Sequence, residues 1–178
     1  MNTIEAVFDG CCEPRNPGGH AAFGSLVRVN GEVVYRNSGY VGHGRQMSNN
    51  VAEYAGALDA LAHAVQHDGI ITLRGDSKLV IMQLGPDRTQ PHGDRRWACH
   101  GGFYEPYYRE ALALVNEHRD RMRFKWVPRD ENSDCDELSK QILIDMGVHF
   151  RIQPIDAVPA ASNKPRRTRR RQVRRDST

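Results

Sequence analysis

Four acidic side chains in this sequence have the chemistry of divalent-metal ligands: Asp9, Glu53, Asp76 and Asp136. They lie far apart along the chain, yet the local pattern predicts that each stands where a strand ends or a helix begins. Carboxylates that converge without balancing bases repel one another, so a fold retains such a cluster when cations neutralise it. Two magnesium ions would do so. The chemistry they would support is metal-assisted cleavage of a phosphodiester.

Each of these acids, taken alone, also has a structural explanation. Asp9 precedes Gly10, and Asp-Gly is a common turn sequence. Glu53 stands three residues after Asn50, the spacing of a capping box at the start of a helix. Asp76 could cap a helix, and Asp136 could complement a helix dipole. The residues alone leave both kinds of explanation open.

The first part of the chain predicts three antiparallel strands. Residues 3–9 alternate between apolar and other side chains, which is the period of a strand, and this strand is expected to end at Asp9-Gly10. Residues 22–29 and 32–40 follow the same period. Asn30-Gly31 joins them, and this pair is a strong signal for a tight hairpin.

The middle of the chain changes to helical spacing. Residues 50–66 predict a long amphipathic helix, in which Ala57, Ala60 and Ala64 share the side of Glu53 and permit close packing on a sheet. A strand at 70–74 then leads through Asp76 into a helix at 77–84. This strand-to-helix turn places Asp76 at the carboxyl edge of a sheet, where α/β proteins bind ligands.

Residues 85–102 are rich in Gly and Pro and carry basic and aromatic side chains from Arg88 to Trp97. We interpret this segment as an irregular loop that could contact a phosphate backbone. The alternative is a solvated surface loop in which Trp97 packs against Tyr104 or Tyr107. Its sequence does not decide between the two.

The last elements are a helix at 104–118, a strand at 123–127 and a helix at 133–146. The spacing of the final helix predicts an inward face of four residues. They are Cys135, Leu138, Ile142 and Met146.

The chain has 178 residues, of which 39% are hydrophobic, enough for one domain with a core and too few in succession to span a membrane. The N-terminus shows no signal or transit pattern, so we expect a cytoplasmic protein. The four cysteines lack the spacing of a zinc site and are expected to be reduced and structural. No heptad seam is visible, so we expect a monomer.

The net charge of +3 conceals a strongly basic end. Residues 164–178 contain eight basic residues and one acid, a net of +7, which leaves 17 basic and 21 acidic residues in 1–163. We therefore predict a catalytic domain at 1–148 and a linker with a basic, disordered tail at 149–178. The tail could recruit nucleic acid through counterion release, act as a nuclear address, or be a solvated end without a role.

The order of these features resembles type 1 ribonuclease H over roughly residues 2–147. The chain presents an Asp at the end of a strand, then a hairpin, a Glu at the start of a helix and a second Asp at the end of a strand. An acid in the first turn of a C-terminal helix completes the order. The matching segments are Asp9-Gly10, Asn16-Pro17-Gly18-Gly19, Ser48-Asn49-Asn50-Val51-Ala52-Glu53, Gly75-Asp76-Ser77, Trp126-Val127-Pro128-Arg129 and Asn132-Ser133-Asp134-Cys135-Asp136-Glu137-Leu138.

The resemblance implies a ribonuclease H-like fold, a mixed five-stranded sheet with three antiparallel strands first, then parallel strands, flanked by helices. It also implies hydrolysis of the RNA strand of RNA/DNA hybrids by two Mg²⁺ ions, which Mn²⁺ could replace, leaving 5′-phosphate and 3′-hydroxyl ends. Asp9 would bridge both ions, Asp136 would help hold the ion at the attacking water, and Glu53 and Asp76 the ion at the leaving oxygen. The family's Asn-x-x-small-Asp-x-Leu pattern selects Asp136, with Asp134 as the alternative.

The same resemblance suggests how a hybrid would be recognised. A protein distinguishes RNA from DNA through the 2′-hydroxyl in the minor groove. Candidate contacts are Gly10, Asn16, Ser48, Asn49 and Asn50, although Asn49 and Asn50 could also cap the helix that follows.

This chain departs from many bacterial members of the family in one loop. Those members carry a His between the last strand and the last helix, whereas this chain has Arg129. Arg129 can bind phosphate but remains protonated, so it cannot act as a general base near neutral pH. Two other classes of function stay open: a non-catalytic hybrid-binding module, and a related metal-dependent DNA nuclease.

Overall fold

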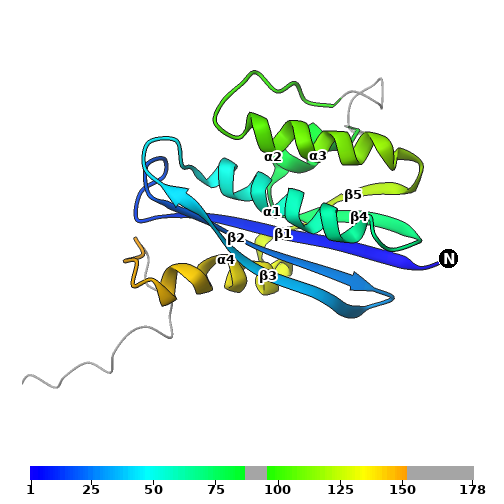
Figure 1. Ribbon diagram of the computed structural model, residues 1–178, viewed down its shortest axis with the longest axis horizontal. Coiled ribbons are helices and arrows are strands. Elements are labelled where there is room, and N and C mark those ends of the chain that lie inside the picture. Colours follow the sequence, from blue (N-terminus) through cyan, green and yellow to red (C-terminus); the bar gives the residue numbers. More distant parts are fainter. Residues whose placement is uncertain (87–95, 152–178) are drawn as a thin grey trace, which may run out of the picture.

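The computed structural model describes residues 1–86 and 96–151 and confirms the expected architecture, a five-stranded mixed sheet with helices on both faces (Figure 1). The strand order is β3-β2-β1-β4-β5. Pairings of β1 with β2 and of β2 with β3 are antiparallel, whereas β1 with β4 and β4 with β5 are parallel. The strands are β1 (Thr3–Glu13), β2 (His20–Val29), β3 (Glu32–His43), β4 (Ile70–Gly75) and β5 (Met122–Trp126).

Strand β1 is longer than the sequence pattern predicted. The expected end at Asp9-Gly10 is wrong, because the chain stays paired with β2 through Glu13. Its pairing with β4, however, stops at Val7 opposite Arg74. Asp9 therefore lies within β1 but just beyond the end of β4. Continued pairing with β2 outweighs the local turn preference of Asp-Gly.

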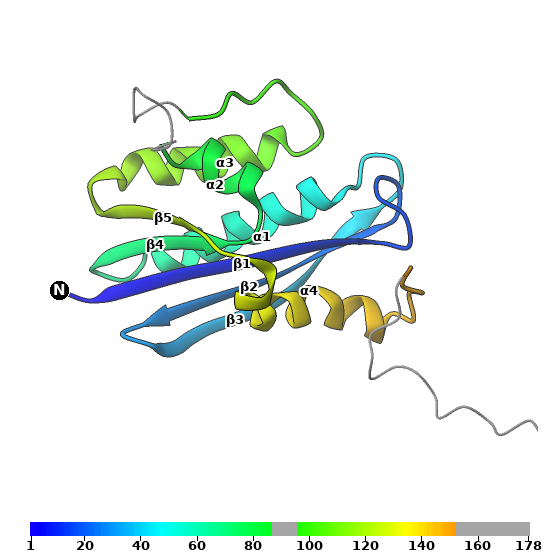
Figure 2. The ribbon, with the colours of Figure 1, turned by 180° about the vertical axis from the view of Figure 1, so that it is seen from behind.

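The helices are α1 (Asn49–Ala64), α2 (Lys78–Leu84), α3 (Glu105–Glu117) and α4 (Ser133–Asp145). Helices α1, α2 and α3 lie on one side of the sheet (Figure 1). In the opposite view, the connection after β5 crosses to the other face, where α4 packs on β1, β2 and β3 (Figure 2). Residues from both ends of the domain therefore meet at the centre of the sheet.

The start of α1 differs from the predicted capping box. Ser48 is the N-cap, and its hydroxyl accepts a hydrogen bond from the backbone N–H of Val51 at 3.3 Å. Asn50 lies inside the helix, so the proposed pairing of Asn50 with Glu53 as a capping box is wrong. With the cap supplied by Ser48, Glu53 is available for another role.

The packing faces of two helices can be compared with their predicted faces. Ala57, Ala60 and Ala64 of α1 are completely buried, as expected for a helix that approaches a sheet closely. On α4 the buried residues are Cys135, Ser139 and Leu143, whereas Leu138 and Ile142 are only partly buried. Met146 is 48% exposed, which corrects its predicted inward position. The helix ends at Asp145, so the stripe follows i, i+4 and i+8 and stops before Met146.

The chain remains packed for a few residues after α4. Phe150 is buried against Cys11, Ala22 and Leu143, and Arg151 pairs with Glu13 at 3.2 Å. Contacts with the sheet thus continue three residues past position 148, and the division into domain and tail stays a prediction. The basic residues 164–178 lie outside the described residues.

Other expectations can be placed in the same way. Arg88 lies outside the described residues, whereas Lys78 Nζ is 5.9 Å from the ring centroid of Trp97. Tyr104 stacks on Tyr54. All four cysteines are free thiols, as expected. Across residues 1–86 and 96–151, each helix is too short or too polar to cross a bilayer.

Candidate metal centre

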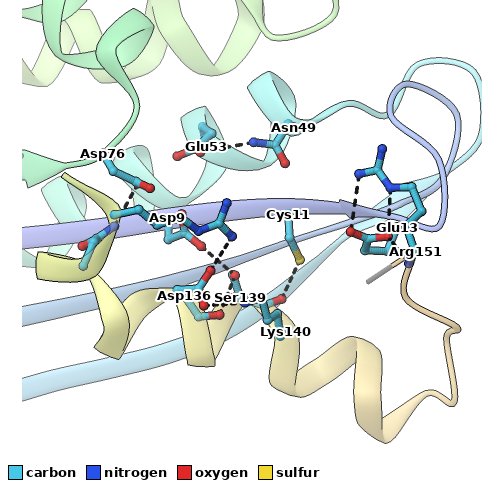
Figure 3. A network of polar contacts seen from close by, with 12 residues as sticks. Asp9, Cys11, Glu13, Asn49, Glu53, Asp76, Asp136, Ser139, Lys140 and Arg151 are labelled. Atoms are coloured by element: carbon cyan, nitrogen blue, oxygen red, sulfur yellow. Dashed lines mark hydrogen bonds and ion pairs between the residues drawn. The ribbon is translucent and has the colours of Figure 1, made fainter. Parts of the chain in front are cut away.

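Three of the four predicted acids come together at the centre of the sheet. Asp9 comes from β1, Glu53 from the first turns of α1, and Asp76 from the residue that follows β4 (Figure 3). One carboxylate oxygen from each lies within 4.8 Å of the other two. This spacing allows three hard oxygen ligands to reach one cation.

Two glycines allow α1 to approach β1 closely enough to form this group. A Cβ at Gly10 would lie 2.3 Å from the backbone nitrogen of Glu53, and one at Gly56 would lie 3.1 Å from the carbonyl oxygen of Asp9. The first distance is too short for any side chain. Gly10 therefore has a packing role in the site, and its expected contact with substrate stays a prediction.

The triad Asp9–Glu53–Asp76 is electrostatically unfavourable without a cation. Asp9 and Glu53 are only 3% and 5% exposed. Burial, followed by the negative charge of Asp76, raises the pKa of Asp9 to about 7. Burial and the charges of Asp9 and Asp76 raise the pKa of Glu53 well above its ordinary value. Both pKa values are raised because these carboxylates have little contact with water and few basic partners.

One carboxylate oxygen of the triad is well suited to bind a cation. Glu53 Oε1 accepts a hydrogen bond from Asn49 Nδ2 at 3.3 Å, but the buried Glu53 Oε2 has no hydrogen-bond partner. A buried unsatisfied carboxylate oxygen is costly unless something binds it. A divalent cation among these oxygens would satisfy the atom and offset the repulsion, so the residues present fit the predicted metal site.

Asp136 is not a member of this group. It lies on α4 near Asp9 (Figure 3), and its Oδ1 accepts a hydrogen bond from Arg129 Nη2 at 2.6 Å while its Oδ2 is paired with Lys140 Nζ. Partial burial acts to raise the pKa of Asp136, but the hydrogen bonds from Lys140 and Arg129 outweigh it, so the pKa is lowered. The alternative acid, Asp134, pairs with Arg28 on β2.

Sequence reasoning missed two side chains that position the acids. Ser139 Oγ lies 2.8 Å from Asp9 Oδ2 and can donate its hydrogen bond there. Asn132 Nδ2 donates to Asp76 Oδ1 at 3.1 Å and to a main-chain carbonyl of β1 at 2.8 Å. The spacing Cys135, Ser139, Leu143 would have been a signal for Ser139, as a polar residue at the centre of a helical stripe, but the predicted face of this helix did not include it. For Asn132 the sequence showed only its place at the start of the segment 132–138, which matches the family pattern, and no indication of a contact with Asp76.

The predicted substrate contacts gather around the start of α1. Asn16 Oδ1 accepts a hydrogen bond from the backbone N–H of Asn49 at 2.9 Å, which joins the turn after β1 to the helix. Ser48 caps the helix, and Asn50 is exposed beside it. The structure thus brings Asn16, Ser48, Asn49 and Asn50 together near Glu53. Their contact with a hybrid stays a prediction.

We expect Arg129→Ala to slow substrate turnover severalfold without eliminating it. The change removes a cation from Asp136 Oδ1 and a candidate phosphate ligand, but leaves the triad intact. Single-turnover cleavage rates of the two proteins would measure the effect. An unchanged rate would identify Arg129 as an ordinary surface residue.

Comparison with known proteins places the chain in a family. The family model described as Reverse transcriptase-like matches residues 7–142. The bifunctional protein Rv2228c of Mycobacterium tuberculosis is 30% identical over 131 residues, which are 72% of this chain and 32% of that protein. The uncharacterized protein YpeP of Bacillus subtilis is 27% identical over 123 residues, covering 64% of this chain and 50% of YpeP. This chain thus spans about a third to a half of the length of these curated relatives.

Solved structures give the same assignment. The N-terminal RNase H domain of Rv2228c, solved as a fusion with maltose-binding protein, has a TM-score of 0.64 and 29% identity, covering 78% of this chain and 97% of that one. RNase H1 from the halophilic archaeon Halobacterium salinarum has a TM-score of 0.64 and 30% identity, covering 80% and 98%. Together these matches show that the chain belongs to the reverse transcriptase-like family, among the type 1 ribonucleases H.

Proposed function

We propose that this protein is an endonuclease that hydrolyses the RNA strand of RNA/DNA hybrids by two-metal-ion catalysis. The products would be 5′-phosphate and 3′-hydroxyl ends. The observation that carries the proposal is the buried triad Asp9–Glu53–Asp76 with its unsatisfied Glu53 oxygen, set in the fold of RNase H1 proteins. Bound Mg²⁺, or Mn²⁺ in its place, would neutralise the attacking and leaving oxygens of an in-line displacement.

Each acid would then have a distinct task. Asp9, at the centre of the group, would hold both ions, since it lies between the two other members and α4 (Figure 3). Glu53 and Asp76 would hold the ion on the leaving-oxygen side. Asp136 would complete the other ion's ligands, and its position beside Ser139, the hydrogen-bond partner of Asp9, supports this choice over Asp134. Ser139 and Asn132 would fix the orientation of Asp9 and Asp76.

The residues around the start of α1 would read the hybrid. The side chains of Asn49 and Asn50, with Ser48 and Asn16 beside them, offer donors and acceptors that can bind 2′-hydroxyls and phosphates. Their closeness to Glu53 would place the recognised RNA strand against the metal centre. Gly10 would contribute indirectly, by letting α1 pack closely on β1 and so holding these residues beside the metal centre.

Incubating the full chain with Mg²⁺ and labelled RNA/DNA hybrid, double-stranded RNA and double-stranded DNA would test this function. We expect cleavage of the RNA strand of the hybrid only, with Mn²⁺ supporting the same reaction and EDTA stopping it. Tight hybrid binding without cleavage would instead favour a non-catalytic binding module. Cleavage of double-stranded DNA would favour a DNA nuclease, and either result would overturn the proposal.

We predict that removing residues 164–178 weakens binding of the hybrid at low salt and flattens the salt dependence of that binding. The segment carries a net charge of +7, and each phosphate neutralised by such a charge releases counterions. Fluorescence anisotropy between about 50 and 200 mM salt would measure this dependence. Cleavage at saturating substrate should persist, because the triad lies in residues 1–86. An unchanged slope would contradict the tethering role.

We propose a cytoplasmic protein that acts as a monomer. Light scattering of the purified chain would measure its mass directly. A dimeric mass would contradict the second statement.

A further inference from the structure

The two sides of the metal centre differ in how their acids are occupied. In the triad, Glu53 Oε2 lacks a partner. Asp136 has the opposite arrangement, because a separate cation is paired with each of its two oxygens: Arg129 with Oδ1 and Lys140 with Oδ2. The triad thus has an oxygen that can receive a cation, whereas Asp136 is already paired with two cationic side chains.

From this contrast we infer that Lys140 is an internal counter-ion of Asp136 that must withdraw before Asp136 can bind a divalent ion, and that it thereby sets the affinity for the second ion. The inference rests on the proposed metal site and adds to it a positioning residue that acts through Asp136. It predicts two binding events of unequal strength in the free protein.

The charges of the site favour this order. The triad brings three carboxyl groups within 4.8 Å of one another. The positive charge of Arg129, the same residue that pairs with Asp136, acts on both Asp9 and Glu53. The two ion pairs of Asp136, with Arg129 and with Lys140, neutralise its charge and leave excess positive charge around it. A first divalent ion is attracted to the triad. A second one approaches Asp136 against an ammonium that occupies the same oxygen, so the two cations compete.

The geometry of the pair allows it to open. Lys140 lies four residues after Asp136 on α4 and forms an i,i+4 pair with it, a kind of ion pair that by itself adds little to helix stability. Its side chain is 29% exposed, and that of Arg129 is 69% exposed. A flexible lysine side chain can rotate into water at small cost. Lys140 therefore moderates binding at Asp136 and does not block it.

Direct titration of the metal-free full chain with Mn²⁺, by calorimetry and by the electron paramagnetic resonance signal of free Mn²⁺, would test the inference without any measurement of cleavage. Wild-type protein should bind one ion tightly and a second at least tenfold more weakly. Lys140→Met, which keeps an unbranched side chain of similar length but removes the charge, should strengthen the second event about tenfold and leave the first within twofold. Lys140→Arg should retain the wild-type pattern.

Two further variants make the result specific. Asp136→Asn should remove the second event, and adding Lys140→Met to it should then have no further effect. Arg109→Gln is the matched control, because it breaks an i,i+4 pair with Glu105 on α3, away from Asp136, and should leave both affinities unchanged.

The inference is overturned if Lys140→Met, folded by circular dichroism, binds the second ion within twofold of wild type, or if wild type shows two equal events or only one. These results are distinct from failure of the proposed function. A chain that fails to cleave hybrids but shows the predicted Mn²⁺ affinities would refute the nuclease proposal and leave the role of Lys140 standing.

Discussion

Asp9→Asn and Asp76→Asn are each expected to lower the rate of RNA cleavage by about a thousandfold or more, a loss of roughly 4 kcal/mol of transition-state stabilisation. Both residues belong to the triad whose oxygens lie within 4.8 Å of one another. An amide in place of the carboxylate keeps the shape and removes the charge that binds the cation. Binding of the hybrid should remain largely intact, because the predicted contacts lie at the start of α1.

The measurement pairs single-turnover cleavage with fluorescence anisotropy of the hybrid. Asp134→Asn provides a matched control on the same helix as Asp136, since Asp134 pairs with Arg28 away from the triad. It should cleave at close to the wild-type rate, whereas Asp136→Asn should be strongly impaired. Wild-type turnover by Asp9→Asn would refute the metal assignment. A severe defect in Asp134→Asn together with an active Asp136→Asn would identify Asp134, and not Asp136, as the fourth acid of the site.

The second large effect is on stability: without metal, the folded protein should become less stable as the pH rises from about 4 to about 7. Burial raises the pKa of Asp9 from 3.8 to about 7. Between these values the folded state retains a proton that the unfolded state has released. Stability is therefore greatest below the unfolded pKa and is lost as the pH rises through the folded one. Glu53, whose pKa is also raised, acts in the same direction.

The expected loss is on the order of a few kcal/mol, or about 5–10 °C in Tm for a domain of this size. Thermal unfolding in EDTA at pH 5 and pH 8 would measure it. Millimolar Mg²⁺ should restore much of the lost stability at pH 8 and little at pH 5, because protonated carboxylates do not bind the ion.

Asp9→Asn supplies the control for this pH dependence, since it removes one of the shifted groups. Its Tm in EDTA should vary less between pH 5 and pH 8 than that of the wild type, with Glu53 responsible for part of the remaining slope. If the metal-free wild type were equally stable at both pH values, the electrostatic picture of the triad would be wrong.

The sequence by itself determined most of the helices and strands and singled out the acids proposed as metal ligands. The period of two in residues 3–9, the Asn30-Gly31 hairpin and the alanine face of α1 depend on side chains close together in the chain, so their patterns were visible. The hairpin shows the expected backbone, with positive φ at both residues (54° and 89°). Motif order was enough to select Asp9, Glu53 and Asp76, which the structure then brought together.

Only the tertiary structure decided how those residues are coupled. The length of β1 depends on its pairing with β2, and the hydrogen bond from Ser139 to Asp9 joins residues 130 positions apart. Local spacing carries no signal for such contacts, because they exist only after distant elements pack. The division of the acids into an unsatisfied triad and an Asp136 paired with Lys140 and Arg129 has the same origin. This division depends on distances of a few ångströms between charged side chains, and the packing of α4 on the sheet sets those distances.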